Sequence, residues 1–448
     1  MLIKYLKVAC FYCMAFVMIW CGAAVSFSVV NSLPGFNAAL PFRLETGYMG
    51  VDDVEFFYYF IESESNPAED PLLLWITGGP GCSSLSGFFF ETGPLRFNMV
   101  EYNGSLPTFF QNQYAWTKVS SIIFLDAPVG TGFSYSRTPH GFKTGDMKHA
   151  ISCFNFLRKW LQSHPKFITN PLYIGGGSYS GMIVPIIALA ISDDNEDKGI
   201  PVVNLKGYFL GNPFADGKFE GNSKIPYYNR MALISDELYE SANRNCQGEY
   251  VQVGNERCAN DLQAISECTA SINEVHISEP KCPSEFSEMG ILRMSTGYPQ
   301  FGCRNYYCYL MKIWASDVNV QKALHIRKGT INEWVRCNLS MDYDYDVPSA
   351  ISYHLRLNSR GYRALIFSGD HDKVVPYVGT ESWIKSLNLS IVSDWRPWFV
   401  DGQVGGYSRE YANGFTFATV KGAGHTPPEY NPQECFAMFN RWISQQPL

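Results

Sequence analysis

The most regular feature of the chain is a series of short apolar runs, several of which stop at glycine, aspartate or lysine. They cover residues 56–61, 72–76, 121–125, 172–174, 205–210, 364–367 and 415–420. Short continuous apolar runs predict strands buried on both faces, as in a mainly parallel sheet. The sequence therefore predicts a central sheet with most of its strands parallel.

Helical periodicity separates several of these runs. Apolar residues from Met147 to Leu161 recur at three- and four-residue steps, which predicts an amphipathic helix over 146–163. A second helix is expected over 314–325. Asn431 precedes a closing helix as its N-cap, with Pro432 and a capping-box Glu434, and its core face is expected to comprise Phe436, Phe439, Trp442 and Ile443. Alternating strands and helices indicate an α/β fold with helices flanking the sheet.

The region 214–313 interrupts this alternation. It is polar and weakly periodic, and it includes six cysteines between Cys246 and Cys308. We interpret it as a disulfide-stapled lid inserted into the α/β core, which then comprises residues 25–213 and 314–448. Such a lid would shape the substrate pocket.

The first 24 residues have a different character. Lys4 and Lys7 precede an apolar run from Val8 that ends among small residues near Ala24. This pattern is typical of a cleaved signal peptide, and a retained signal anchor is the alternative. Export to the extracellular space or the vacuole agrees with disulfide-type cysteine usage and with three glycosylation sequons, at Asn103, Asn338 and Asn388. No later run is apolar enough to span a membrane.

Charge and composition exclude some partners. The 448 residues carry a formal net charge of −7 and lack a dense Lys/Arg cluster, which argues against nucleic-acid binding. The cysteines have no companion histidines at zinc-type spacing, so we expect neither a metal nor a cofactor.

The segment 171–185 contains the strongest candidate for chemistry. An apolar run breaks into three glycines, presents Ser178 and resumes as an apolar helix. This is the layout of a nucleophile elbow, in which Gly176 and Ser180 provide small neighbours and the Tyr179 amide can stabilise an oxyanion. The alternative is an ordinary tight loop.

Three other strand ends complete the pattern. The strand at 72–76 stops in a glycine-rich loop whose Gly79 amide is a candidate second oxyanion donor. Asp370 and Asp372 follow a later strand, and His425 follows the last one. The chain order Ser…Asp…His is that of the α/β-hydrolase triad, and we choose Asp372 as its acid, with Asp370 bracing the loop. His371 is interpreted as a polar loop residue.

Four motifs together resemble the serine carboxypeptidase family over nearly the whole mature chain: residues 75–84, 176–181, 369–372 and 422–425. Within it, the sequence is most similar to plant serine carboxypeptidase-like proteins, including acyltransferases that use glucose esters. The resemblance implies that Ser178 forms an acyl-enzyme, His425 moves the proton and Asp372 orients the imidazole. It also implies the disulfides Cys82–Cys337, Cys246–Cys258 and Cys282–Cys303.

The resemblance also identifies substrate-binding positions, at Thr77, Gly78, Glu91 and Gly177. Carboxypeptidases of the family grip a peptide carboxylate with an asparagine in the first glycine loop and with two acids that share a proton. Here Glu91 is present, but Thr77 replaces the asparagine and Gly177 the second acid. Without that partner, we expect Glu91 to ionise more readily and to repel a carboxylate.

Thr77 and Ser180 resemble the acyltransferase branch, whereas Gly177 departs from both branches. The favoured prediction is a secreted acyltransferase that moves an acyl group from a small glucose ester to an alcohol. The alternatives are a carboxypeptidase acting on peptide C-termini and a weakly active binding homologue. The sequence does not predict the donor, the acceptor, the oligomeric state or any proteolytic processing of the lid.

Overall fold

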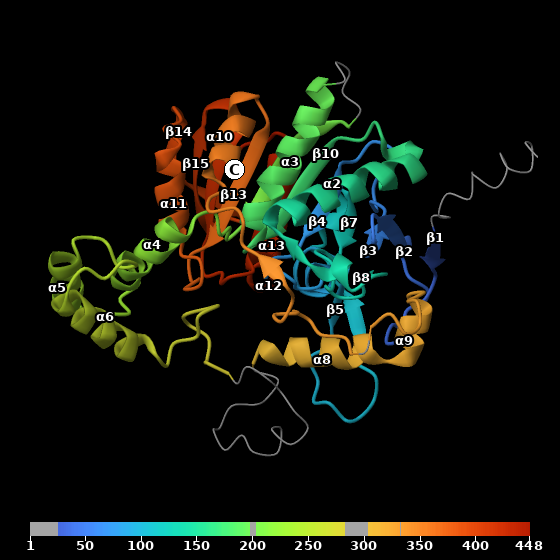
Figure 1. The fold of residues 1–448 in the computed structure, drawn as a ribbon, viewed down its shortest axis with the longest axis horizontal. Helices are drawn as coiled ribbons and strands as arrows, with labels where there is room; N and C mark the ends of the chain where they lie inside the picture. The colour runs from blue at the N-terminus through green and yellow to red at the C-terminus, as the bar shows by residue number, and fades with distance from the viewer. Residues whose placement is uncertain (1–25, 198–202, 283–302, 332) are drawn as a thin grey trace, which may run out of the picture.

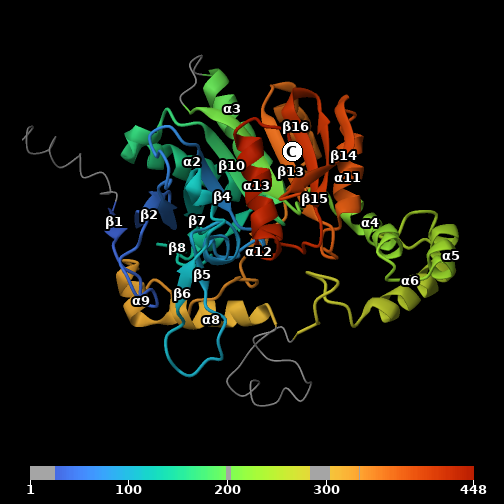
Figure 2. The same ribbon diagram turned by 180° about the vertical axis from the view of Figure 1, so that it is seen from behind.

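One large mixed sheet organises the chain in the computed structural model, which describes residues 26–197, 203–282, 303–331 and 333–448 (Figures 1 and 2). Its strands are β1 (Ser26–Val30), β2 (Leu44–Val51), β3 (Val54–Ile61), β4 (Leu72–Ile76), β7 (Ser121–Leu125), β8 (Tyr135–Ser136), β10 (Leu172–Gly177), β11 (Leu205–Gly211), β13 (Arg363–Gly369), β14 (Ile391–Val400), β15 (Gln403–Tyr411) and β16 (Phe415–Val420). Two small two-stranded sheets lie apart from it, formed by β5 (Leu95–Phe97) with β6 (Phe109–Gln111) and by β9 (Thr144–Gly145) with β12 (Tyr343–Asp344).

The strand order across the sheet is β1-β2-β3-β7-β4-β10-β11-β13-β16-β15-β14, with β8 paired to β3. From β7 to β16 neighbouring strands run parallel, whereas both edges are antiparallel. The predicted mainly parallel sheet is thus confirmed. Three predicted strands, β4, β7 and β16, have the expected bounds, and β10 continues three residues beyond its apolar run, to Gly177.

The described helices include those that cover the two faces of the sheet and those of the insertion after β11. They are α2 (Asp146–Ser163), α3 (Ser180–Asp197), α4 (Gly217–Arg230), α5 (Asp236–Cys246), α6 (Glu256–Thr269), α8 (Asn305–Ser316), α9 (Val318–Ala323), α10 (Ile351–Ser359), α11 (Tyr377–Ser386), α12 (Pro427–Tyr430) and α13 (Pro432–Ile443), with a π-helical turn, η1, over Gly87–Glu91. Short 3-10 turns occupy Trp116–Lys118, His140–Phe142, Pro165–Phe167 and Ala412–Gly414. One apolar core lies under α2, α3, α10 and α11, and a second under η1, α8, α9 and α13.

Two helix predictions need correction. The single helix expected over 314–325 is wrong, because α8 ends at Ser316 and α9 begins at Val318. Asp317 between them is extended, and its carboxylate accepts hydrogen bonds from the Asn319 and Val320 amides, so a new N-cap forms inside the apolar pattern. Asn431 precedes α13 as predicted, but its side chain caps no amide and donates to the Lys421 carbonyl instead.

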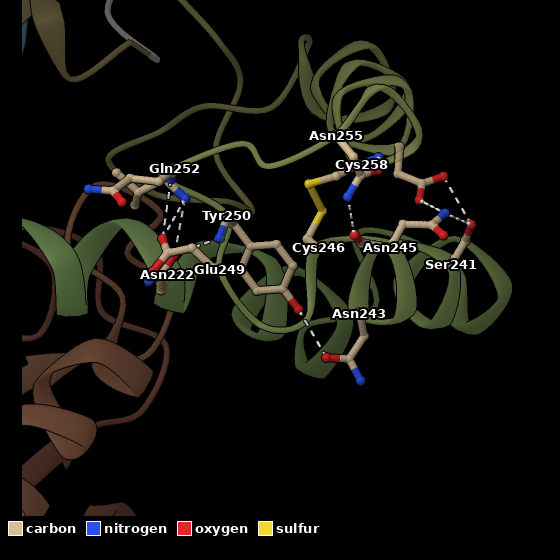
Figure 3. The surroundings of a disulfide bond; sticks show 12 residues. Asn222, Ser241, Asn243, Asn245, Cys246, Glu249, Tyr250, Gln252, Asn255 and Cys258 are labelled. Carbon is tan, nitrogen blue, oxygen red and sulfur yellow. Dashed lines mark hydrogen bonds between the residues drawn. A yellow bond between two sulfur atoms is a disulfide. The ribbon is translucent and has the colours of Figure 1, made fainter.

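The insertion after β11 forms a small helical unit beside the sheet, where α4, α5 and α6 surround their own apolar cluster (Figure 1). The disulfide Cys246–Cys258 joins the end of α5 to the start of α6 (Figure 3). Nearby, Asn255 caps α6 and also donates to the Asn245 carbonyl, which ties the two helices together. The division into core and lid stays a prediction. Within the range assigned to the lid, α8 packs in the second core of the sheet.

Disulfides join all three pairs that the family resemblance implies. Cys82 pairs with Cys337 and Cys282 with Cys303, in addition to the lid pair. Of the predicted glycosylation sites, Asn103 and Asn388 are exposed, whereas the Asn338 amide donates to the Gly130 carbonyl. No helix within the described ranges has both the length and the hydropathy needed to cross a bilayer. The predicted signal peptide, residues 1–24, lies outside those ranges.

Candidate active site

The strand β10 and the helix α3 meet at Ser178 in a sharp turn. Ser178 has a φ of 58°, a left-handed conformation that only a tightly constrained turn imposes on serine. Its amide donates to the Gly211 carbonyl at 3.0 Å, and its carbonyl accepts from the Phe214 amide at 2.9 Å. These bonds to the adjacent strand end fix the turn and leave the hydroxyl free for another partner.

Small neighbours are essential at this turn. A Cβ on Gly176 would lie 2.2 Å from the Ile76 carbonyl oxygen, so the strand ends β4 and β10 approach too closely for any side chain there. The Ser180 hydroxyl donates to the same oxygen at 2.7 Å. The sequence pattern of small residues around Ser178 thus has a direct steric cause.

Three side chains from three strand ends converge here. The His425 Nε2 lies 2.9 Å from the Ser178 Oγ, and the His425 Nδ1 lies 2.8 Å from an oxygen of Asp372. Because a carboxylate accepts at Nδ1, the Nδ1 atom carries the proton and Nε2 is the free base that faces the serine. This geometry suits proton transfer from the hydroxyl.

Asp372 is fully buried, and both of its carboxylate oxygens accept hydrogen bonds. Besides the imidazole, it accepts from the Asn212 amide at 2.7 Å and from the backbone amides of Val374 and Val375. Asp370 points elsewhere, since its carboxylate accepts from Lys421 and from the Gly422 amide. Of the two aspartates considered, the structure places Asp372 on the histidine and Asp370 on the loop that follows β16.

Burial and the Asp372 carboxylate shift the pKa of His425 in opposite directions. Burial acts to lower the pKa of His425, but the Asp372 carboxylate and its hydrogen bond outweigh burial, so the pKa of His425 is raised above 6.5. The cationic form that arises on proton uptake is therefore stabilised by Asp372.

The glycine loop after β4 lies directly against the elbow. A Cβ on Gly78 would lie 2.9 Å from the Tyr179 nitrogen and 2.8 Å from the Ser178 Cβ. Among the described residues, the amides of Gly79 and Tyr179 have no protein acceptor, which leaves both available to an oxyanion. The loop is braced from below by the buried Asp126, which accepts from Ser83 and Ser84.

A pocket opens over the serine with a cavity volume of about 170 Å³. It brings together every residue predicted to bind substrate. Its lining includes Thr77, Gly78, Gly79, Phe90, Glu91, Gly177, Ser178, Arg336, His425, Thr426 and Glu429. At Gly177 an added Cβ would meet only the Gly211 carbonyl within 4 Å, at 3.3 Å, so the missing side chain leaves open space on that wall.

The expectation that Glu91 repels a carboxylate is wrong at neutral pH, because the group is not ionised there. Glu91 is buried at the end of η1, and burial, followed by repulsion from Glu429, raises its pKa to about 8. Arg336, Arg96 and the protonated form of His425 only partly oppose this shift. Glu91 therefore holds a proton at neutral pH and can donate a hydrogen bond.

Two charged pocket residues were missed from the sequence. Glu429 follows His425 by four positions on α12, and Arg336 precedes Cys337. The expected disulfide Cys82–Cys337 was a usable signal, because it places residue 336 beside the glycine loop. No comparable signal pointed to Glu429. The described residues contain no group of His, Cys, Asp and Glu side chains arranged to hold a metal ion.

Comparison with known proteins identifies the family. A family model described as serine carboxypeptidase matches residues 34–445. The chain belongs to the serine carboxypeptidase family. Serine carboxypeptidase-like 7 of Arabidopsis thaliana is 50% identical over 428 residues, covering 94% of each chain. Serine carboxypeptidase-like 8 of the same plant is 49% identical and covers 94% of this chain and 96% of its own.

A solved structure supports the fold of this serine carboxypeptidase-like chain. Kex1Δp, a prohormone-processing carboxypeptidase from Saccharomyces cerevisiae, superposes with a TM-score of 0.74 at 21% identity, covering 92% of this chain and 94% of its own. The predicted α/β-hydrolase fold is confirmed. Family membership supports an enzyme that acts on peptide or ester substrates, without distinguishing the two.

Proposed function

We propose that this protein is an acyltransferase that works through an acyl-enzyme on Ser178. Its substrates would be a small ester donor, of the glucose-ester class, and an alcohol acceptor. The observation that carries the proposal is the pocket lining, where Thr77 and Gly177 stand in place of the amide and the acid that grip a peptide carboxylate. The nucleophile has a base within reach, because Ser178 Oγ and His425 Nε2 lie 2.9 Å apart.

In the first half-reaction, His425 Nε2 takes the Ser178 proton while Oγ bonds to the donor carbonyl carbon. The carbonyl oxygen becomes an oxyanion beside the Gly79 and Tyr179 amides. When this tetrahedral intermediate collapses, the bond to the sugar oxygen breaks and His425 returns the proton to that oxygen. The products are the free sugar and an ester on Ser178.

In the second half-reaction, the acceptor hydroxyl gives its proton to His425 and bonds to the acyl carbon. The bond to Ser178 Oγ then breaks, and His425 reprotonates the serine. Asp372 stabilises the imidazolium in both halves, because it is buried and already oriented by Asn212.

Carboxypeptidase activity is the second candidate, and Glu91 favours it. As a neutral acid at pH values below about 8, Glu91 can donate a hydrogen bond to a peptide carboxylate rather than repel it. Arg336 lines the same pocket and adds a positive charge. In this alternative, water replaces the alcohol in the second half-reaction.

Purified protein offered a glucose ester with an alcohol, and separately an N-blocked dipeptide, distinguishes these functions. Ester exchange without amino-acid release supports the acyltransferase, and amino-acid release supports the peptidase. A serine-directed phosphonate that labels Ser178 while neither substrate turns over would indicate a different ester substrate. Failure of a folded protein to label at Ser178 would support the non-catalytic binding homologue.

The setting of this reaction is also a proposal. Three disulfides and exposed sequons at Asn103 and Asn388 suit passage through the secretory pathway to the extracellular space or the vacuole. Peptide mapping of the protein purified from its source, with and without a glycosidase, tests both cleavage near residue 24 and glycan attachment.

A further inference from the structure

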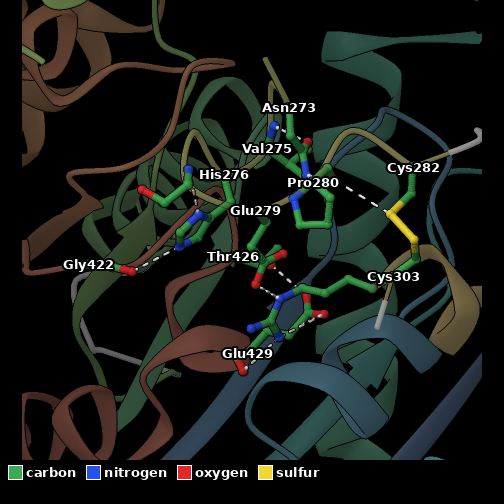
Figure 4. A network of polar contacts seen from close by, with 12 residues as sticks. Asn273, Val275, His276, Glu279, Pro280, Cys282, Cys303, Gly422, Thr426 and Glu429 are labelled. Atoms are coloured by element: carbon green, nitrogen blue, oxygen red, sulfur yellow. Dashed lines mark hydrogen bonds and ion pairs between the residues drawn. A yellow bond between two sulfur atoms is a disulfide. The ribbon is translucent and has the colours of Figure 1, made fainter. Parts of the chain in front are cut away.

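Part of the lid lies against both loops that carry Asp372 and His425. We call residues 273–280, which follow α6, the strap. The strap lies beside the loop after β16, and Figure 4 shows its His276 directed at the Gly422 carbonyl. None of its residues lines the pocket over Ser178. Its contacts with the active site are therefore with the protein rather than with substrate.

The first set of strap contacts holds the His425 loop. The His425 amide donates to the Val275 carbonyl at 2.8 Å, and His276 Nε2 donates to the Gly422 carbonyl at 3.0 Å. A Cβ on Gly424 would lie 2.3 Å from the Val275 oxygen, so the two segments are in close backbone contact. The first of these bonds is made by the backbone amide of His425 itself. The strap therefore fixes the backbone position from which the imidazole extends.

The second set holds the Asp372 loop on both sides of the acid. The Ile277 amide donates to the His371 carbonyl at 3.0 Å, and the Lys373 amide donates to the Glu274 carbonyl at 2.9 Å. The Lys373 ammonium also lies 3.6 Å from the Glu274 carboxylate. The strap is thus bonded to the neighbours of the acid and to the base at once.

The ring of His276 is oriented by a hydrogen bond at each nitrogen. Its Nδ1 accepts from the Ser278 amide at 3.2 Å, which leaves Nε2 to carry the proton that it donates to Gly422. The side chain is only 7% exposed and its ring lies against His371 and Tyr430. One nitrogen therefore shapes the strap, and the other joins it to the His425 loop.

A clasp secures the far end of the strap. Glu279 accepts from Arg304 at 2.7 Å, and the same guanidinium lies 3.7 Å from the Glu429 carboxylate and stacks on Tyr430. The disulfide Cys282–Cys303 closes the chain just beyond it. The strap is consequently anchored to α12, the short helix that follows His425.

We propose that the strap is a positioning element for the base His425. The hydrogen bond from His276 to the Gly422 carbonyl is the contact through which a side-chain substitution can change that position. The inference rests on the proposed roles of Ser178 and His425. A shift of one loop by about 1 Å would lengthen the contact between Nε2 and Oγ and can slow the reaction about a hundredfold. His276 touches no substrate in this proposal.

Two substitutions separate the two nitrogens of His276. His276→Gln keeps a donor near the Nε2 position, whereas His276→Asn keeps an acceptor near the Nδ1 position but cannot reach Gly422. We expect the rate of Ser178 labelling by a small phosphonate to fall at least about tenfold in His276→Asn and to stay within about threefold of wild type in His276→Gln. Labelling by a small phosphonate depends on the serine, its base and the oxyanion donors, and not on the rest of the substrate pocket.

Asn255→Ala provides the matched control. It removes the N-cap of α6, at the end of that helix away from the strap, and should lower the melting temperature without slowing labelling. Glu279→Gln, which weakens the clasp at a partly exposed position, should slow labelling less than His276→Asn and guards against a variant that fails to fold.

Equal labelling rates in wild type and in both folded His276 variants would overturn the proposal, as would an equal slowing in Asn255→Ala. If His276→Asn does not fold, an unchanged rate in Glu279→Gln overturns it instead. Absence of labelling in the wild-type protein would refute the proposed role of Ser178, which is a separate result.

Discussion

Glu91 and Glu429 line the active-site pocket together, and their proximity makes a measurable prediction about pH. The pKa of Glu91 is about 8 against an ordinary 4.5, mainly through burial and then through the Glu429 charge. A shift of that size corresponds to about 5 kcal/mol of preference for the protonated form, at about 1.4 kcal/mol per pKa unit. If the neutral acid binds substrate, kcat/KM should fall as pH rises through about 8.

Glu429→Gln removes one negative charge and keeps the acceptor that Thr426 uses. Because repulsion by Glu429 raises the pKa of Glu91, its loss should move the alkaline limb of kcat/KM to lower pH. Burial remains the larger cause, so we expect a displacement of about one unit rather than a return to the ordinary value. The acid limb, governed by the raised pKa of His425, should stay within a few tenths of a unit.

The same carboxyl predicts a stability effect whose sign is fixed. A folded-state pKa above the unfolded value means that the native protein binds the extra proton, so the stabilisation is complete below about pH 4.5 and is lost as pH rises through 8. Glu91→Gln should match wild type at pH 5 and exceed its free energy of unfolding at pH 9, by up to about 5 kcal/mol. Urea denaturation at both pH values measures the difference.

Glu410→Gln is the control for the kinetic experiment. Glu410, on β15, pairs with Arg396, on β14, and neither residue lines the pocket. It should leave both limbs of the pH profile in place. The reasoning is refuted if Glu91→Gln retains an alkaline limb near pH 8, because Glu91 is then not the titrating group. If Glu91→Gln loses the limb and Glu429→Gln does not move it, the coupling between the two acids is refuted alone.

Three further predictions concern the loops around the serine. In Asp126, one carboxylate oxygen accepts from Ser83 and Ser84 and the other accepts from the Phe133 amide. Asp126→Asn leaves a single oxygen, which cannot serve both sides, so we expect a loss of about 2 kcal/mol in thermal unfolding and slower phosphonate labelling. Unchanged labelling would remove Asp126 from loop positioning. Gly176→Ala should abolish soluble folded protein, seen by circular dichroism, because its Cβ would meet the Ile76 oxygen at 2.2 Å. Cys337→Ser should leave Cys82 alkylatable by iodoacetamide and slow acylation, whereas a wild-type protein whose Cys82 is already alkylatable would contradict the disulfide.

The centre of the fold could be predicted from the sequence because its strands are covered on both faces. Strands β4, β7 and β16 are wholly buried, so each is a continuous apolar run with the bounds that the run predicts. The carboxyl ends of parallel strands meet at one edge, and this places Ser178, Asp372 and His425 together without further information. Chain order and strand position were sufficient for that part of the site.

The edge strand β14 escaped prediction because it is exposed. Strand β14 is mostly exposed and contains Pro397, so it has no apolar run. A usable signal was present all the same. Asp401 and Gly402 join β14 to β15 with φ values of 48° and 78°, the conformation that an Asp-Gly hairpin turn favours.

The sequence motif could not predict that Glu91 is protonated. The charge state of Glu91 depends on its burial at the end of η1 and on Glu429, which lies near the other end of the chain. The resemblance assigned the missing second acid to position 177, next to the serine, and offered no reason to look on α12. Local pattern predicts which groups reach a pocket from a strand end, whereas the free energy of charging them depends on all their neighbours.

A substitution in the lid can act through the pocket or through the strap, and its position in the sequence alone does not show which. Residues inserted after β11 determine which substrates fit only where they reach the pocket, whereas the strap acts on His425 and the Asp372 loop through backbone bonds. Under our proposal, a lid substitution that displaces the strap lowers kcat for every substrate alike, because it alters the base and not the pocket. A substitution that changes the ratio of kcat/KM between two donors must act on the pocket lining instead. Measuring two donors for each lid variant therefore distinguishes loss of alignment from change of specificity.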